Sequence, residues 1–279
     1  MNRLIISTFR RLWKSKIFWL GMSAMCVFGI IVTYARKRDG DILGAEYGTP
    51  DGILFIGATY FLITAAVFVT LFIGDEHASG TWRNKITAGY SRTEIYLTYL
   101  FVTTVASLLM HLSYIVAVFG LSKVWLGAAQ IPPEVTTVFF YCSLFTVIAI
   151  NSLMVMLCML IHSRSATIVV CMLLALALMM GGLYIYQLLS APEILTGPPS
   201  IINGQLVYPQ SSPNPKYLTG VKRAFFQFLH DFLPGGQMIT IGMTEQLPAN
   251  VWVLPIYSIV FSLICSLSGI LVFRRKDLK

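Results

Sequence analysis

The sequence predicts an all-α polytopic membrane protein with a single transmembrane domain over residues 1–279. The expected architecture is an N-terminal interfacial amphipathic helix, six transmembrane helices and a large external loop before the last helix. Hydrophobic residues make up 56% of the 279 residues and charged residues 11%, whereas soluble domains average about 25% charged residues. The mean hydropathy is +0.74. The same composition excludes intrinsic disorder, which requires few apolar residues and many charges.

Residues 2–15 are predicted to form the amphipathic helix, lying in the membrane interface. One face carries Leu4, Ile5, Thr8, Phe9, Leu12 and Trp13, and the other carries Arg3, Ser7, Arg10, Arg11 and Lys14. A basic topology signal without fixed structure is the alternative, because positive charges beside a span need no fold.

Six apolar segments are each about as long as the roughly 20 residues that a helix needs to cross the hydrocarbon core. They form a bundle over residues 17–273 and span residues 17–34, 53–73, 97–121, 135–161, 166–189 and 251–273. None contains Asp, Glu, Lys or Arg. The first is interpreted as an uncleaved span, because no small-x-small cleavage site ends its apolar run.

Charge asymmetry predicts the orientation. The N-terminus, residues 74–96, residues 162–165 and the C-terminus hold 13 basic and 4 acidic residues, whereas the other three loops hold 7 basic and 8 acidic residues. By the positive-inside rule the first set is cytoplasmic, so both termini are expected in the cytoplasm of a multi-pass plasma-membrane protein. The net charge of +8 is therefore interpreted as a topology signal, and no nucleic-acid partner is expected.

Residues 191–250 are predicted to form the large external loop. Eight of the twelve prolines lie in it or at its edge, and the proline-rich stretch 198–215 excludes a regular helix. Residues 217–233 are expected to form a short external helix that packs on the membrane or re-enters it. The sequence Pro234-Gly235-Gly236 is expected to end that helix.

The sequence lacks three common motifs of nucleotide-binding proteins, metalloproteases and hydrolases. It contains no Gly-Lys dipeptide, and therefore no G-x-x-x-x-G-K-[ST] phosphate loop, and neither HExxH nor GxSxG. No catalytic or metal site is expected, and the five cysteines are interpreted as apolar filler. His111 and Asn151 are expected to hydrogen-bond for packing, His111 to a neighbouring helix near Ser113 or Tyr114. Binding of a proton or a metal ion is the alternative for His111. Because the spans lack the charged groups of ion-coupled transporters, a transport function would need energy from a partner.

The loop between the second and third spans has a residue pattern that resembles a loop of a known protein family. It opens with the acidic pair Asp75-Glu76, continues with Gly80-Thr81 and a basic stretch, and ends with Ser91-Arg92 at the next helix start. This loop resembles the first cytoplasmic loop of ATP-binding-cassette type-2 exporter permeases. The layout of the whole chain is similar to that family as well, and most similar to Gram-positive permeases that export antimicrobial or toxin peptides or confer immunity to them.

The resemblance implies a permease that pairs with a second copy or a paralogue and with two cytoplasmic ATPase subunits, amid membrane lipids. ATP and Mg would bind the partner ATPase, with no cofactor on this chain. The loop would form a coupling helix, with coupling positions Asp75, Glu76, Gly80, Thr81, Arg83 and Arg92. Arg164 in the short loop 162–165 would make a second contact. From the residues themselves, Asp75, Glu76, Arg83 and Lys85 can form charge pairs within the loop or with a partner. A solvated connector whose charges only set topology is the alternative.

In this family the second and fifth spans face the central pathway. The resemblance therefore implies a substrate path that includes Thr59, Tyr60, Phe61, Thr64 and Phe68 on the second span and Met172, Met179, Met180, Tyr184 and Tyr186 on the fifth. Methionine suits variable apolar cargo, so an amphipathic or hydrophobic substrate, such as a peptide, is expected. Packing against lipid or other helices remains the alternative for these residues. An ATP-independent secondary transporter, a membrane-bound enzyme and a non-transporting sensor subunit remain alternative functions.

Overall fold

The computed structural model describes residues 1–44, 47–78, 81–161, 163–195, 200–202, 205–207, 211–244 and 246–275. The helices are α1 (Asn2–Lys14), α2 (Lys16–Leu43), α3 (Ile56–Ala78), α4 (Thr81–Thr87), α5 (Arg92–Trp125), α6 (Pro133–Leu160), α7 (Arg164–Leu189), α8 (Gly220–Phe232), α9 (Pro234–Met243) and α10 (Val253–Arg275). Four short strands lie between α7 and α8: β1 (Ile194–Leu195), β2 (Ser200–Ile202), β3 (Gln205–Val207) and β4 (Ser212–Pro213).

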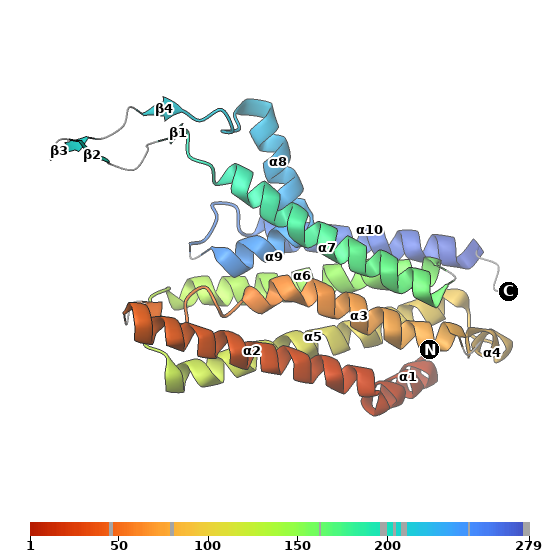
Figure 1. The fold of residues 1–279 in the computed structure, drawn as a ribbon. Helices are drawn as coiled ribbons and strands as arrows, with labels where there is room; N and C mark the ends of the chain where they lie inside the picture. Colours follow the sequence, from red (N-terminus) through yellow and green to blue (C-terminus); the bar gives the residue numbers. More distant parts are fainter. Residues whose placement is uncertain are drawn as a thin grey trace.

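Six of these helices, α2, α3, α5, α6, α7 and α10, are long and apolar enough to cross a membrane. Each contains most of one of the six segments expected from the sequence, so the chain is an all-α polytopic membrane protein. The six helices run alongside one another in one bundle (Figure 1). The N-terminus, α4 and the end of α10 lie at the same end of that bundle (Figure 1), as an even number of spans requires.

The first spanning helix is longer than the sequence predicted. The apolar run ends near Tyr34, but α2 continues to Leu43. The additional turns are polar, and the Arg36 side chain bonds back to the following segment, donating to the Thr49 carbonyl at 3.1 Å and the Asp51 carbonyl at 3.3 Å. Helical backbone hydrogen bonds do not stop where hydrophobicity stops, so the apolar run gave only a lower bound on this helix.

The N-terminal helix forms as predicted and is amphipathic. Leu4, Thr8 and Leu12, spaced four residues apart, form its buried face. The ring of Phe9 meets the ring of Phe101 on α5 edge to face, with centroids 6.0 Å apart. The helix therefore rests on the bundle along one stripe, and its basic residues lie mostly on the remaining surface.

Hydrogen bonds join α5 and α6 within the bundle. The Asn151 amide nitrogen donates to the hydroxyls of Thr104 at 2.8 Å and Thr103 at 3.2 Å, and its carbonyl oxygen accepts from Ser107 at 3.1 Å. The expected packing role of Asn151 agrees with these contacts. The expected hydrogen bond of His111 to a neighbouring helix is present, because its Nε2 lies 3.0 Å from Ser143 Oγ on α6. Ser143 faces α5 across the helix pair, whereas Ser113 and Tyr114 share a helix with His111.

The segment between α7 and α10 holds a strand arm and two helices. The strands pair antiparallel as β1 with β4 and β2 with β3, and they reach away from the bundle (Figure 1). The predicted external helix is present as α8, and it ends at Phe232, just before Pro234 as expected. A second helix, α9, was not predicted. It begins at Pro234, and its residues from Pro234 to Gly242 are all buried.

Glycine brings the backbones of α7 and α9 into close contact. A Cβ atom added at Gly182 would lie 2.7 Å from the carbonyl carbon of Gly235, and one added at Gly235 would lie 2.1 Å from the carbonyl oxygen of Leu178. The Pro-Gly-Gly sequence therefore ends α8 and also provides the flat surface that lets α9 pack on α7.

Gln237 fixes α9 to its other neighbours. Its amide oxygen accepts hydrogen bonds from Thr146 on α6 at 2.8 Å and Ser258 on α10 at 2.6 Å. Its amide nitrogen donates to the carbonyls of Asp231 at 2.7 Å and Leu254 at 3.3 Å. The four hydrogen bonds use the full capacity of the side chain, so this completely buried polar group stabilises the contact between α9, α6 and α10.

Candidate functional site

The loop that follows α3 contains the short helix α4, whose C-terminal end is defined by its own sequence. Gly89 has φ +89°. The amide of Tyr90 bonds to the Lys85 carbonyl and that of Gly89 to the Ile86 carbonyl, a Schellman ending that requires this left-handed glycine. Ser91 and Glu94 then form a capping box at the start of α5. The Ser-Arg-Thr-Glu sequence thus has a local structural role.

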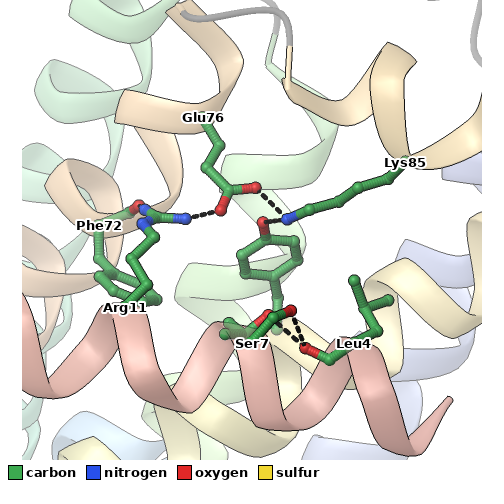
Figure 2. A network of polar contacts seen from close by, with 8 residues as sticks. Leu4, Ser7, Arg11, Phe72, Glu76 and Lys85 are labelled. Carbon is green, nitrogen blue, oxygen red and sulfur yellow. Dashed lines mark hydrogen bonds and ion pairs between the residues drawn. The ribbon is translucent and has the colours of Figure 1, made fainter. Parts of the chain in front are cut away.

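Glu76, at the end of α3, is the centre of a charge cluster (Figure 2). Its side chain is 6% exposed. One carboxylate oxygen pairs with Arg11 of α1 and the other with Lys85 of α4. Lys85 also donates to the Tyr99 hydroxyl on α5, and Arg11 donates to the Phe72 carbonyl on α3. The carboxylate therefore joins α3 to α1 and α4, and Lys85 extends the cluster to α5.

Burial lowers the pKa of both cations of the cluster. Burial lowers the pKa of the Arg11 guanidinium to about 10, against the opposing charge of Asp75. It also lowers the pKa of the Lys85 ammonium, against the opposing charge and hydrogen bond of Glu76. Arg11 keeps its proton at neutral pH. The cluster thus holds cations in surroundings that disfavour charge, and Glu76 is the acid in contact with both.

Trp82 attaches α4 to the bundle on its inner face. It is 3% exposed, and its ring lies edge to face with Phe273 of α10, with centroids 5.4 Å apart. The outer face of α4 is polar and exposed and carries Arg83, Asn84 and Thr87. The helix is therefore fixed from inside by Trp82 and Lys85, while its outer face is exposed.

The other coupling positions suggested by the sequence lie around this helix. Asp75 pairs with Arg164 at 2.8 Å, which joins the end of α3 to the start of α7, and both side chains are nearly half exposed. Arg92 donates to the carbonyls of Phe273 at 3.2 Å and Arg274 at 3.3 Å, at the C-terminal end of α10. Thr81 is the first residue of α4. Gly80 lies outside the described residues.

Sequence reasoning identified the charge pair of Glu76 with Lys85 as possible within the loop, and the structure contains it. It did not identify Arg11, Trp82 or Tyr99 as members of this site. Arg11 was assigned to the polar face of the first helix, and no sequence pattern indicates that this one arginine reaches 65 positions along the chain to Glu76. Trp82 is a large aromatic residue in an otherwise polar loop, and this pattern indicates a side chain that packs into the protein.

The predicted path residues of α3 pack within the protein. Thr59 donates to the Met238 carbonyl of α9 at 3.2 Å, and Thr64 lies 3.4 Å from the sulfur of Met25 on α2. The Phe68 ring is buried between neighbouring aromatic rings. Tyr60, at 44% exposed, is the most accessible of the four and contacts the ring of Phe28.

The predicted path residues of α7 differ from one another in exposure. Met180 is 52% exposed, whereas Met172 and Met179 are partly buried against the core. None of the ten predicted path positions lines the cavity of about 620 Å³ among residues 50–55, 119–139, 241 and 244, or a smaller one of about 200 Å³ between α7 and α8.

No family model matches this chain, and no curated protein is recognisably similar to it in sequence.

Proposed function

We propose that this chain is the transmembrane subunit of an ATP-driven exporter, powered by two copies of a separate cytoplasmic ATPase and paired with a second permease. The observation that carries the proposal is the arrangement of α4. A seven-residue helix between two spans is fixed on its inner face by a buried charge cluster and presents a polar outer face. A helix held in this way transmits force between an attached ATPase and the spans more directly than a loose connector does.

The distribution of charge supports the accompanying topology. In this proposal α4, both termini and the short loop before α7 lie in the cytoplasm, and α1 lies in the membrane interface with its basic residues toward the headgroups. The Asp75–Arg164 pair then joins the two cytoplasmic loops that an ATPase would contact. The exposed apolar surface of α7 would face the second permease or lipid, and the uncharged spans favour an amphipathic or hydrophobic substrate, such as a peptide.

Replacement of Arg83 tests the ATPase contact. Arg83→Glu reverses a charge on the outer face of α4 and is expected to reduce co-purification with the cognate ATPase and ATP-dependent export into inverted vesicles by tenfold or more. Loss of a desolvated charge pair at an interface costs about 2–5 kcal/mol. The matched control is Lys222→Glu, the same charge change on an exposed position of α8, which should retain both. Export without any ATPase, or normal assembly of Arg83→Glu, would contradict the proposal.

Cysteine labelling tests the orientation. Ser211→Cys in the strand arm should react with a membrane-impermeant maleimide on intact cells, whereas Ala88→Cys at the end of α4 should react only after the membrane is opened. Both positions are exposed, so a difference reports sidedness and not burial. The five native cysteines lie in apolar segments, and the unmodified protein gives their background. Equal labelling of the two positions on intact cells would exclude this topology.

A further inference from the structure

A cavity of about 620 Å³ lies at the end of α5 that is distant from α4. Because α5 has 34 residues, its two ends are about 50 Å apart. The walls are mainly apolar and include Leu54, Phe55, Phe119, Leu126, Phe139 and Ile241. Ligand pockets in proteins occupy about 300–1,000 Å³ and are lined mainly by such side chains. Neither the charge cluster nor the proposed substrate path involves this cavity.

Asp51 stabilises the wall of the cavity through its carboxylate. Its carboxylate accepts hydrogen bonds from the backbone amides of Gln130 at 2.8 Å and Ile131 at 3.1 Å. The side chain is 8% exposed. Its charge is therefore engaged in holding the loop between α5 and α6 against residues 50–55, and this connection fixes the shape of the cavity.

Lys123 supplies a cation at the opening. It lines the cavity and is exposed, and its Nζ lies 4.3 Å from the centre of the Phe119 ring, which also lines the cavity. Within the described ranges no ion pair involves Lys123. The neighbouring Ser122 is 7% exposed, and its hydroxyl has no hydrogen-bond partner there. The site thus combines an apolar interior with a cation and an unsatisfied hydroxyl.

Aromatic residues place this opening at the depth of lipid headgroups. Trp125, two residues from Lys123, contacts Tyr34 of α2 edge to face, with ring centroids 6.3 Å apart. Tryptophan and tyrosine concentrate at the two membrane–water interfaces. A lysine at this depth meets the phosphates of the adjoining leaflet, while the cavity beside it extends among apolar side chains.

We propose that this cavity binds one acyl chain of an anionic phospholipid from the adjoining leaflet, with the lipid phosphate held by Lys123. The apolar lining matches the acyl chain, and the cation that lacks a carboxylate partner matches the headgroup. The proposal does not depend on the exporter function, because it rests on the cavity and on the membrane-spanning fold.

Lipid binding to the purified full-length chain tests this site. In neutral detergent, phosphatidylglycerol should remain bound in native mass spectra and raise the thermal unfolding midpoint more than phosphatidylcholine with the same acyl chains. Lys123→Gln should weaken phosphatidylglycerol binding about fivefold, since one basic residue near a lipid surface contributes about 1 kcal/mol. Lys222→Gln removes an exposed lysine of α8 and should leave the preference unchanged.

A second variant tests the cavity apart from the charge. Thr136→Trp places an indole in the cavity from α6, whose Thr136 lines it, and should lower the binding of both lipids. Equal binding of the two lipids to the unmodified protein would overturn the proposal. An unchanged lipid preference in Lys123→Gln would do so even if Thr136→Trp failed to fold. Displacement of bound lipid by an uncharged hydrophobic peptide, with no effect of Lys123→Gln, would assign the cavity to a peptide instead.

Discussion

Glu76→Gln is expected to destabilise the protein by about 3–5 kcal/mol, the usual cost of removing one partner from a buried ion pair. The substitution keeps the size of the side chain and removes its charge, so the partly buried Arg11 and Lys85 lose the carboxylate that pairs with both. The thermal unfolding midpoint of the purified protein in detergent measures the loss. Because the cluster joins α1, α3, α4 and α5, the variant should also lose ATPase-dependent export.

The neighbouring acid provides the matched control. Asp75→Asn removes the same charge one residue earlier, but Asp75 and its partner Arg164 are nearly half exposed, and exposed pairs contribute only about 0–1 kcal/mol. A double variant then isolates the cause. Lys85→Met combined with Glu76→Gln removes one of the stranded cations and should be less destabilising than the sum of the single changes. Equal losses for Glu76→Gln and Asp75→Asn would refute the structural importance of the buried cluster.

Gly182→Ala is expected to destabilise the protein by about 1–3 kcal/mol, the typical cost of overpacking. The added methyl would lie 2.7 Å from the carbonyl carbon of Gly235, a backbone atom that cannot move aside as a flexible side chain does. Helix α9 must shift to accommodate it, and this shift strains the hydrogen bonds of Gln237. Thermal unfolding again measures the loss.

Gly181 is the control for this substitution. It precedes Gly182 on α7, and a Cβ atom at Gly181 would have no atom within 4 Å among the described residues. Gly181→Ala therefore gains the helix preference of alanine, about 0.5–1 kcal/mol, and should leave stability unchanged or slightly raised. If the two alanine variants unfold at the same temperature, the close packing of α7 on α9 does not limit stability.

The spanning helices could be predicted because the physical requirement for a span is local. A run of about 20 apolar residues is sufficient, and all six predicted segments lie largely within long apolar helices. Helix α9 could not be predicted in the same way, because Pro234-Gly235-Gly236 has the local signature of a helix end. The structure uses those glycines for contact with α7, a requirement that depends on the three-dimensional neighbour and not on the local sequence.

In the candidate site too, the local sequence does not determine which side chains become buried. The sequence placed Asp75 and Glu76 side by side as equivalent acids of one loop, yet Glu76 is 6% exposed and Asp75 is nearly half exposed. Position on the last turn of α3 decides which acid faces Arg11 and Tyr99. The charge pattern of a loop predicts that ion pairs are available, and helix geometry selects which of them becomes buried.

The bonds of Gln237 have a consequence for biosynthesis. Two of them reach Ser258 and Leu254 on α10, the last of the six long helices to leave the ribosome. Until α10 is synthesised, the Gln237 amide on α9 lacks its bonds to Leu254 and Ser258. Water or another protein must satisfy that part of the amide in the nascent chain. The native position of α9 is therefore completed only after translation has passed residue 258, and a chain truncated before α10 should be a preferred target of membrane quality-control proteases.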